Sequence, residues 1–240
     1  MTTRTVETSQ LIAARVAGLA YLLIIILGLL KGIFWESSLI VSGNDAATVN
    51  NIIANELQFR LVVASELILY VLVVLLSLAL YIVLKPVNKN LALAALFFRF
   101  GEGIIGVVIT VLSGLIPLLL LNRQAVFETE QLQALVGLFL NLRTAGLDIV
   151  LLFIGLGGTI FCYLFFQSKY VPRILASWGI FTYLSMLILA FLNILLPNRP
   201  AMIEIVLFAL GALFEVIFGF WLWFKGVNVQ QRDNFALESA

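Results

Sequence analysis

Three ionisable residues lie inside long apolar stretches of this chain, where a charged side chain is costly without a partner. Arg99 and Glu102 lie in one such stretch, and Glu215 lies in another. A charged side chain at the centre of a bilayer costs about 2.5–3.5 kcal/mol on insertion scales, so each of these residues needs a partner inside the protein. Arg99 and Glu102 are three residues apart, which places them on one face of a helix. With two acids and one base, the group is a candidate ligand-binding site, because an acid left unpaired in apolar surroundings could bind or carry a proton.

A second group of charged residues occurs nearer the ends of the apolar stretches. It consists of Arg60, Glu66, Arg143 and Asp148. With a rise of 1.5 Å per residue, the first group falls roughly 12–17 Å along its helices, close to the midplane of a bilayer. Glu66 and Asp148 fall about 27 Å along theirs, and Arg60 and Arg143 lie higher still. We call the first group the midplane cluster and the second the outer cluster, and we treat both as candidate binding sites.

Three interpretations of these charges stay open. They could form ion pairs between helices that fix packing and register, since buried pairs can specify an arrangement while adding little net stability. They could instead line a polar cavity, because ionisable residues inside a membrane commonly mark the path of a ligand or a proton. An intramembrane enzyme that uses two carboxylates as acid and base is the third hypothesis. The absence of histidine and of a nucleotide-binding domain counts against the enzyme.

The composition indicates that this chain lies in a membrane and not in water. Of its 240 residues, 62% are hydrophobic and 11% are charged, whereas soluble domains have about 25% charged residues. The net charge of +1 and the lack of a long charge run argue against a nucleic-acid surface. The chain has no histidine, the commonest general base and metal ligand, and its one cysteine, Cys162, lies in an apolar segment. We therefore expect no cofactor and no metal site, and we favour a non-enzymatic function.

Six apolar segments are long enough to cross a membrane as helices, which takes about 20 residues each. They cover residues 11–34, 57–84, 91–121, 132–166, 174–196 and 202–224. The fourth segment is longer than one crossing needs, so its first turns are expected to stand above the membrane. Residues 35–56 are expected to form a polar loop, and Pro117 is expected to kink the third segment. The predicted fold is an all-α bundle of six transmembrane helices, in a single domain over residues 1–240.

Lysine and arginine are distributed unevenly between the two ends of this predicted bundle. One end collects Arg4, Lys85, Lys89, Lys169, Arg173, Lys225 and Arg232. The other end has fewer basic residues, several of them with acidic neighbours: Lys31, Arg60, Arg123 and Arg199. Because basic short loops stay in the cytoplasm, both termini are predicted to be cytoplasmic.

Glycines occur at close spacing in two of the segments. Residues 101–106 read Gly-Glu-Gly-Ile-Ile-Gly, which matches the GxGxxG pattern of dinucleotide-binding loops. That pattern requires a preceding strand and the start of a helix, whereas this one lies inside an apolar helix, so we reject it. Its glycines, like Gly155, Gly157 and Gly158, are expected to let a neighbouring helix approach closely.

A short internal similarity suggests that the two halves of the chain are related. The matching positions are Arg15–Leu19 with Arg143–Leu147, and Glu102 and Gly106 with Glu215 and Gly219. Halves of three helices each would have opposite orientations in the membrane, as in transporters that are built from inverted repeats. Matches this short between apolar segments also arise by chance.

Sequence patches spread over most of the chain point to a family. They are Ala14–Leu23, Asn55–Leu57, Phe59–Arg60, Leu80–Tyr81, Lys85–Asn88, Leu91–Leu93, Phe98–Arg99, Ser168–Leu175 and Trp221–Val227. With these patches the chain resembles a bacterial membrane family catalogued as domain of unknown function 4386. The stretch Leu142–Asp148 matches that family only loosely. The resemblance implies a six-helix integral membrane protein and brings no activity, cofactor or ligand with it.

The sequence therefore leads to one favoured function and one alternative. We expect a multi-pass protein of a bacterial cytoplasmic membrane that binds or transports a small molecule, a lipid or a proton-coupled solute at the midplane cluster. The alternative is a structural or accessory subunit whose charges only hold helices together. The expected partners are the lipid bilayer and a small-molecule or lipid ligand. Nucleic acid is excluded, and a membrane-protein partner or a second copy of the chain stays open.

Overall fold

The computed structural model describes residues 2–41, 43–123, 126–196 and 201–228. These residues form helices and short connections, and no strand occurs among them. Six helical units are long and apolar enough to cross a membrane: Thr8–Glu36, Glu56–Leu84, Lys89–Leu121, Thr129–Ser168, Arg173–Leu195 and Met202–Lys225. The prediction of an all-α fold with six helical segments long and apolar enough to span a membrane is therefore confirmed. Arg199 and Arg232, two residues used to predict the orientation, lie outside the described residues.

The helices follow the chain with few interruptions. They are α1 (Thr2–Leu30), α2 (Asp45–Ala54), α3 (Glu56–Leu84), α4 (Lys89–Thr110), α5 (Ile116–Leu121), α6 (Thr129–Ser168), α7 (Arg173–Leu195) and α8 (Ala201–Phe220). Wider π-helical turns extend three of the spanning units: η1 (Lys31–Glu36) follows α1, η2 (Val111–Leu115) joins α4 to α5, and η4 (Trp221–Lys225) follows α8.

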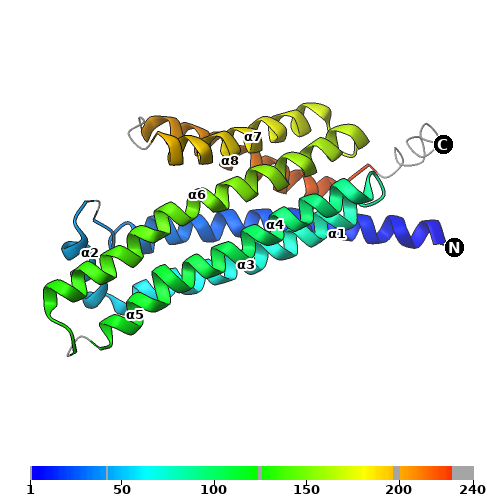
Figure 1. The fold of residues 1–240 in the computed structure, drawn as a ribbon. Helices are drawn as coiled ribbons and strands as arrows, with labels where there is room; N and C mark the ends of the chain where they lie inside the picture. Colours follow the sequence, from blue (N-terminus) through cyan, green and yellow to red (C-terminus); the bar gives the residue numbers. More distant parts are fainter. Residues whose placement is uncertain (1, 42, 124–125, 197–200, 229–240) are drawn as a thin grey trace.

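The six spanning units are arranged in a ring that follows their order in the chain. Each unit packs on the next, from α1 and α3 through α4 and α6 to α7 and α8, and α8 closes the ring against α1. Figure 1 shows the units running lengthwise, with α6 between the α3–α4 pair and the α7–α8 pair. Helix α1 begins at the end of the bundle where α3 turns into α4. Consecutive units are therefore antiparallel.

This ring does not have the symmetry of an inverted repeat. A two-fold axis in the membrane plane would map the first three units onto the last three. Such a rotation turns a clockwise order into an anticlockwise one. The last three units would then follow one another around the ring in the direction opposite to that of the first three. In the observed contacts, all six units follow one another around the ring in the same direction, from α1 to α8. The short internal sequence matches therefore do not correspond to repeated halves of the fold.

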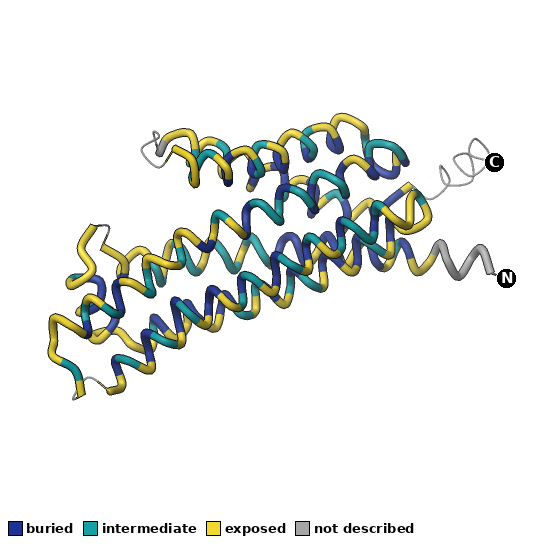
Figure 2. Tube along the Cα trace, in the orientation of Figure 1, coloured by how far each residue is buried: buried dark blue, intermediate teal, exposed yellow. Residues whose placement is uncertain are grey.

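Each spanning helix has a buried face and an exposed face, as Figure 2 shows. The exposed faces carry large apolar side chains, among them Ile68, Phe97 and Ile188, which are more than half exposed. Apolar surface on this scale would promote aggregation in water. Lipid tails are as apolar as these side chains, so the same surface is stable inside a bilayer.

The segment after the first span is more ordered than the predicted polar loop. It contains the ten-residue helix α2, whose first turn is capped by Asn44: the Asn44 side chain accepts a hydrogen bond from the Ala47 amide at 2.9 Å. Val49 and Ile52 of α2 are fully buried, and α2 packs on the first turns of α6. With 40 residues, α6 is about 60 Å long, twice the thickness of the hydrocarbon core. Its extra turns pack against α2.

Pro117 is the second residue of α5, which follows the π-helical turn η2. Proline has no backbone N–H, so a carbonyl in the preceding turn loses its normal partner. A wider turn is one way for a helix to accommodate this loss without ending. The predicted irregularity at Pro117 thus takes the form of a local change in helix type.

Candidate functional site

The midplane cluster begins with an ion pair inside α4. Nη1 of Arg99 lies 2.7 Å from Oε2 of Glu102, as the three-residue spacing predicted. The two residues are only 4% and 2% exposed. The pair meets at ion-pair distance, yet the Glu102 Oε2 atom makes no hydrogen bond. Glu215 of α8 lies within electrostatic range of Arg99, so the three predicted residues occupy one region of the bundle.

Two tyrosines that sequence reasoning missed complete this cluster. The hydroxyl of Tyr183 in α7 donates a hydrogen bond to Oε1 of Glu215 at 2.9 Å. The hydroxyl of Tyr21 in α1 lies 2.9 Å from that of Tyr183. Because Tyr183 uses its proton toward Glu215, Tyr21 must be the donor to Tyr183. The chain of hydroxyls connects α1, α7 and α8. A hydroxyl group inside an apolar segment was the only signal in the sequence that could have pointed to them.

Neighbouring glycines of α6 make room for this cluster. A Cβ atom on Gly157 would lie 2.7 Å from Cγ of Arg99, and one on Gly158 would lie 2.4 Å from the ring of Tyr183. Both distances are shorter than any normal contact. The glycines of segment four thus serve the close packing that the sequence predicted, and they admit two of the cluster's own side chains.

The outer region holds a different arrangement of charges. Arg143 of α6 pairs with Glu66 of α3 through Nη2, and with Glu36 of η1 through Nη1, which lies 2.5 Å from Oε1. Nζ of Lys31 lies 2.9 Å from Glu66 and 3.5 Å from Glu36. Two cations and two anions therefore alternate in a closed circuit that ties α1, α3 and α6 together. We call these four residues the outer network.

Lys31 and Glu36 were not among the predicted site residues, and the reason lies in the backbone. They are five residues apart, which in an α-helix would place them about 140° apart around the axis. The π-helical turn η1 spans exactly these residues. Its wider turn brings residues five apart onto the same side. A pattern search based on α-helical spacing could not have paired them.

The other two residues of the predicted outer cluster lie elsewhere. Arg60 is half exposed and pairs with Glu56, one turn earlier, at 2.6 Å. It is six residues from Glu66, so the two side chains leave α3 in directions about 120° apart. The structure therefore does not bring Arg60 into the cluster. Asp148 of α6 accepts a hydrogen bond from the Asn193 amide of α7, and no ion pair reaches it from the described residues.

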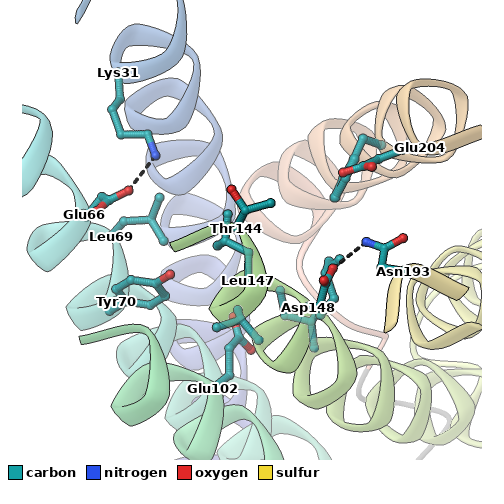
Figure 3. A pocket seen from close by; sticks show the side chains of 14 residues that line it. Lys31, Glu66, Leu69, Tyr70, Glu102, Thr144, Leu147, Asp148, Asn193 and Glu204 are labelled. Atoms are coloured by element: carbon teal, nitrogen blue, oxygen red, sulfur yellow. Dashed lines mark hydrogen bonds and ion pairs between the residues drawn. The ribbon is translucent and has the colours of Figure 1, made fainter. Parts of the chain in front are cut away.

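A cavity of about 580 Å³ connects the two regions. In Figure 3, Glu66 and Asp148 lie on opposite walls, and Glu102 lies at the end of the cavity farthest from Lys31. Leucine, isoleucine and valine side chains and Phe208 form most of the remaining wall. A volume of this size, with a mostly apolar lining and a few convergent polar groups, is typical of small-molecule sites.

Comparison with known proteins gives a family and no function. No curated protein and no solved structure shows significant similarity to this chain. One family matches, that described as Domain of unknown function (DUF4386), over residues 16–226. This range contains the midplane cluster and the outer network, and it confirms the resemblance seen in the sequence patches. The chain therefore belongs to the DUF4386 family.

Proposed function

We propose that this protein is a binding or transport protein for a small organic cation, which it holds in the cavity between the midplane cluster and the outer network. It would act as a single six-helix domain in the cytoplasmic membrane of a bacterium. The observation that carries the proposal is the unequal number of charges around the cavity.

The outer network is electrically balanced, and the rest of the cavity is not. Lys31 and Arg143 compensate Glu36 and Glu66. In the midplane cluster, by contrast, Arg99 alone faces two carboxylates, and Asp148 has the neutral Asn193 amide as its hydrogen-bond partner. Carboxylates that outnumber their compensating cations are costly in apolar surroundings. A bound cation between Glu102 and Asp148 would relieve that cost.

The walls favour an organic cation over a metal ion. Among the described residues, no three acidic or cysteine side chains come close enough together to hold a metal. The carboxylates are instead spread around the cavity, separated by aliphatic side chains and Phe208. Such a surface suits a substituted ammonium group, whose charge is surrounded by hydrocarbon.

The charge count also supports coupling to a proton. One guanidinium can compensate one carboxylate, so the Glu102–Glu215 pair can hold one further positive charge, either a proton or the bound cation. A ligand that binds at Glu102 would then take the place of a proton. The net charge of the buried cluster would stay the same in both states.

The position of the cavity supports access from the outer side. Lys31 lies near the end of the first span, and Asn193 and Glu204 flank the connection between α7 and α8. This end of the bundle is opposite to the one where α1 begins and where Lys85, Lys89, Lys169 and Arg173 occur. We propose that the basic end, with both chain termini, is cytoplasmic, in line with the positive-inside rule. The ligand would then enter from outside.

Three ring compounds that differ in charge test the proposal on the purified protein in detergent. Benzyltrimethylammonium should raise the Tm in a concentration-dependent way, because a ligand that binds only the folded state stabilises it. Benzyl alcohol and benzoate should not. Asp148→Asn should weaken the response to the cation, whereas Arg60→Gln, an exposed residue near the same end, should leave it unchanged. Equal stabilisation by benzoate, or an undiminished response in Asp148→Asn, would contradict the proposal.

The alternative of a structural or accessory subunit is supported by the balanced outer network. Its charges form a complete circuit among α1, α3 and α6 and leave no charge for a ligand. If the midplane cluster served the same purpose, neutralising Glu102 would destabilise the protein as strongly as neutralising Glu66. A membrane-protein partner or a second copy that co-purifies in mild detergent would further support this alternative.

A further inference from the structure

A groove on the lipid-facing side of α1 and α3 lies apart from the cation cavity. It consists of two hollows, an apolar one of about 550 Å³ and one of about 500 Å³ at the helix ends that is lined by Lys85 and Lys89. Ser9 and Ile82 line both hollows, so the two lie next to each other. The groove therefore leads from a basic mouth to an apolar channel.

The apolar channel results from the sizes of its side chains. Ala13 of α1 and Ala79 of α3 are buried and form its floor. Ile12, Leu75 and Leu78 stand on either side of them, and each is about half exposed. Small residues facing one another between larger ones leave a furrow along the α1–α3 contact. Because this surface faces hydrocarbon, its natural occupant is an acyl chain.

The basic mouth lies at the level where lipid headgroups are expected. Lys85 ends α3 and Lys89 begins α4, so both mark the boundary of the apolar spans. From Ile82 to Leu75 the channel extends about 10 Å into the hydrocarbon. Nζ of Lys85 also lies 6.0 Å from the centre of the Tyr81 ring, which also lines the mouth. Two lysines next to a membrane surface attract anionic lipids.

A buried glutamine lies at the mouth of the groove. Gln10 is 2% exposed and lines the basic hollow. Its Nε2 donates to the carbonyl of Val83 at 3.0 Å, whereas its Oε1 makes no hydrogen bond. A buried acceptor without a donor is costly.

We propose that this groove binds an anionic phospholipid, with the phosphate between Lys85 and Lys89 and one acyl chain over Ala13 and Ala79. The lipid would bind at the end of the bundle that contains the chain termini. It would seal the contact between α1 and α3 from the side. This site is independent of the cation cavity, and neither proposal depends on the other.

Native mass spectrometry of the detergent-purified protein tests this proposal, with phosphatidylglycerol and phosphatidylcholine of identical acyl chains as probes. Two lysines should give phosphatidylglycerol an advantage in affinity of about tenfold or more. The double variant Lys85→Gln/Lys89→Gln should reduce that advantage to less than about threefold. The matched control Lys169→Gln/Arg173→Gln removes two basic residues from the turn between α6 and α7, which is not part of the groove, and should keep the full advantage.

A third variant and a soluble probe separate the two parts of the groove. Ala79→Leu fills the channel and should weaken both lipids. Glycerol 3-phosphate, a headgroup without chains, should not compete at concentrations equal to the lipid. The proposal is overturned if the double lysine variant retains the full preference, if the control variant loses it equally, or if glycerol 3-phosphate competes as well as the lipid. An unchanged Tm of the double lysine variant without lipid shows that the fold is intact.

Discussion

The outer network and the midplane cluster both place acids and bases among apolar helices, but they differ in balance and in connectivity. The outer network has two cations for two anions, and its bonds run between α1, α3 and α6. The midplane cluster has one cation for two anions, and its ion pair lies within α4. Separately, hydrogen bonds among Tyr21, Tyr183 and Glu215 connect α1, α7 and α8. The same residue types thus suit a lock between helices in one place and a binding site in the other.

The largest effect should come from opening the outer network. Glu66→Gln leaves Lys31 and Arg143 with Glu36 as their only ion-pair partner among the residues that the structure describes. Removing one partner of a buried ion pair costs about 3–5 kcal/mol, because the remaining charge is stranded. We expect a loss of this size in the free energy of unfolding, and a marked fall in Tm in detergent.

A double variant shows whether the loss of stability comes from the stranded charge or from any substitution at Glu66. Glu66→Met combined with Arg143→Met removes one charge of each sign and leaves the pair of Lys31 and Glu36 in place. We expect it to recover most of the stability, since replacing a buried pair by apolar side chains is often neutral or favourable. If the double variant is less stable than Glu66→Gln, the network is not a balanced lock.

The next effect should come from the chain of tyrosines. Tyr183→Phe removes the hydrogen bond to Glu215 and also the acceptor of Tyr21. A hydrogen bond to a charged group contributes about 1.5–3 kcal/mol, so we expect a loss in that range by thermal or chemical unfolding. Tyr21→Phe is the matched control, because it removes only a bond between two hydroxyls and should cost about 0.5–1.5 kcal/mol. Equal losses would mean that Glu215 does not depend on Tyr183.

A smaller effect on stability is expected at Glu102, where the comparison with the outer network is most direct. Glu102→Gln leaves Arg99 with Glu215 as a counter-charge, so the free energy of unfolding should fall by less than about 1.5 kcal/mol. The same variant should lose the rise in Tm with benzyltrimethylammonium, which the parent protein should show. A stability loss as large as that of Glu66→Gln would make the midplane cluster a second lock and would favour the structural alternative.

The smallest effect should come from Arg60. Its pair with Glu56 is exposed and lies within one helix, and such pairs contribute less than about 1 kcal/mol. Arg60→Gln should therefore change the Tm by less than about 4 °C. A larger change would mean that Arg60 belongs to the outer cluster after all, as its position in the sequence had suggested.

Much of the architecture could be read from local sequence. The number of spanning helices follows from six apolar segments that each exceed a bilayer crossing, and no long-range information is needed for it. The Arg99–Glu102 pair follows from a spacing of three residues within one helix. The close packing of Gly157 and Gly158 follows from the absence of side chains. Each of these features depends on residues that are neighbours along one helix.

The cavity and the outer network could be identified only from the tertiary structure. Glu66 and Arg143 both lie toward the outer ends of their apolar spans, which the sequence shows. Only the rotation of α3 and α6 about their axes turns these two side chains toward each other and turns Arg60 away. Lys31 and Glu36 align through a π-helical turn that α-helical periodicity does not predict. Tyr21, Tyr183 and Glu215 come from three helices that meet where the ring closes. Helix rotation and ring order are set by the packing of many side chains at once, whereas helix length and burial in lipid are set by composition alone.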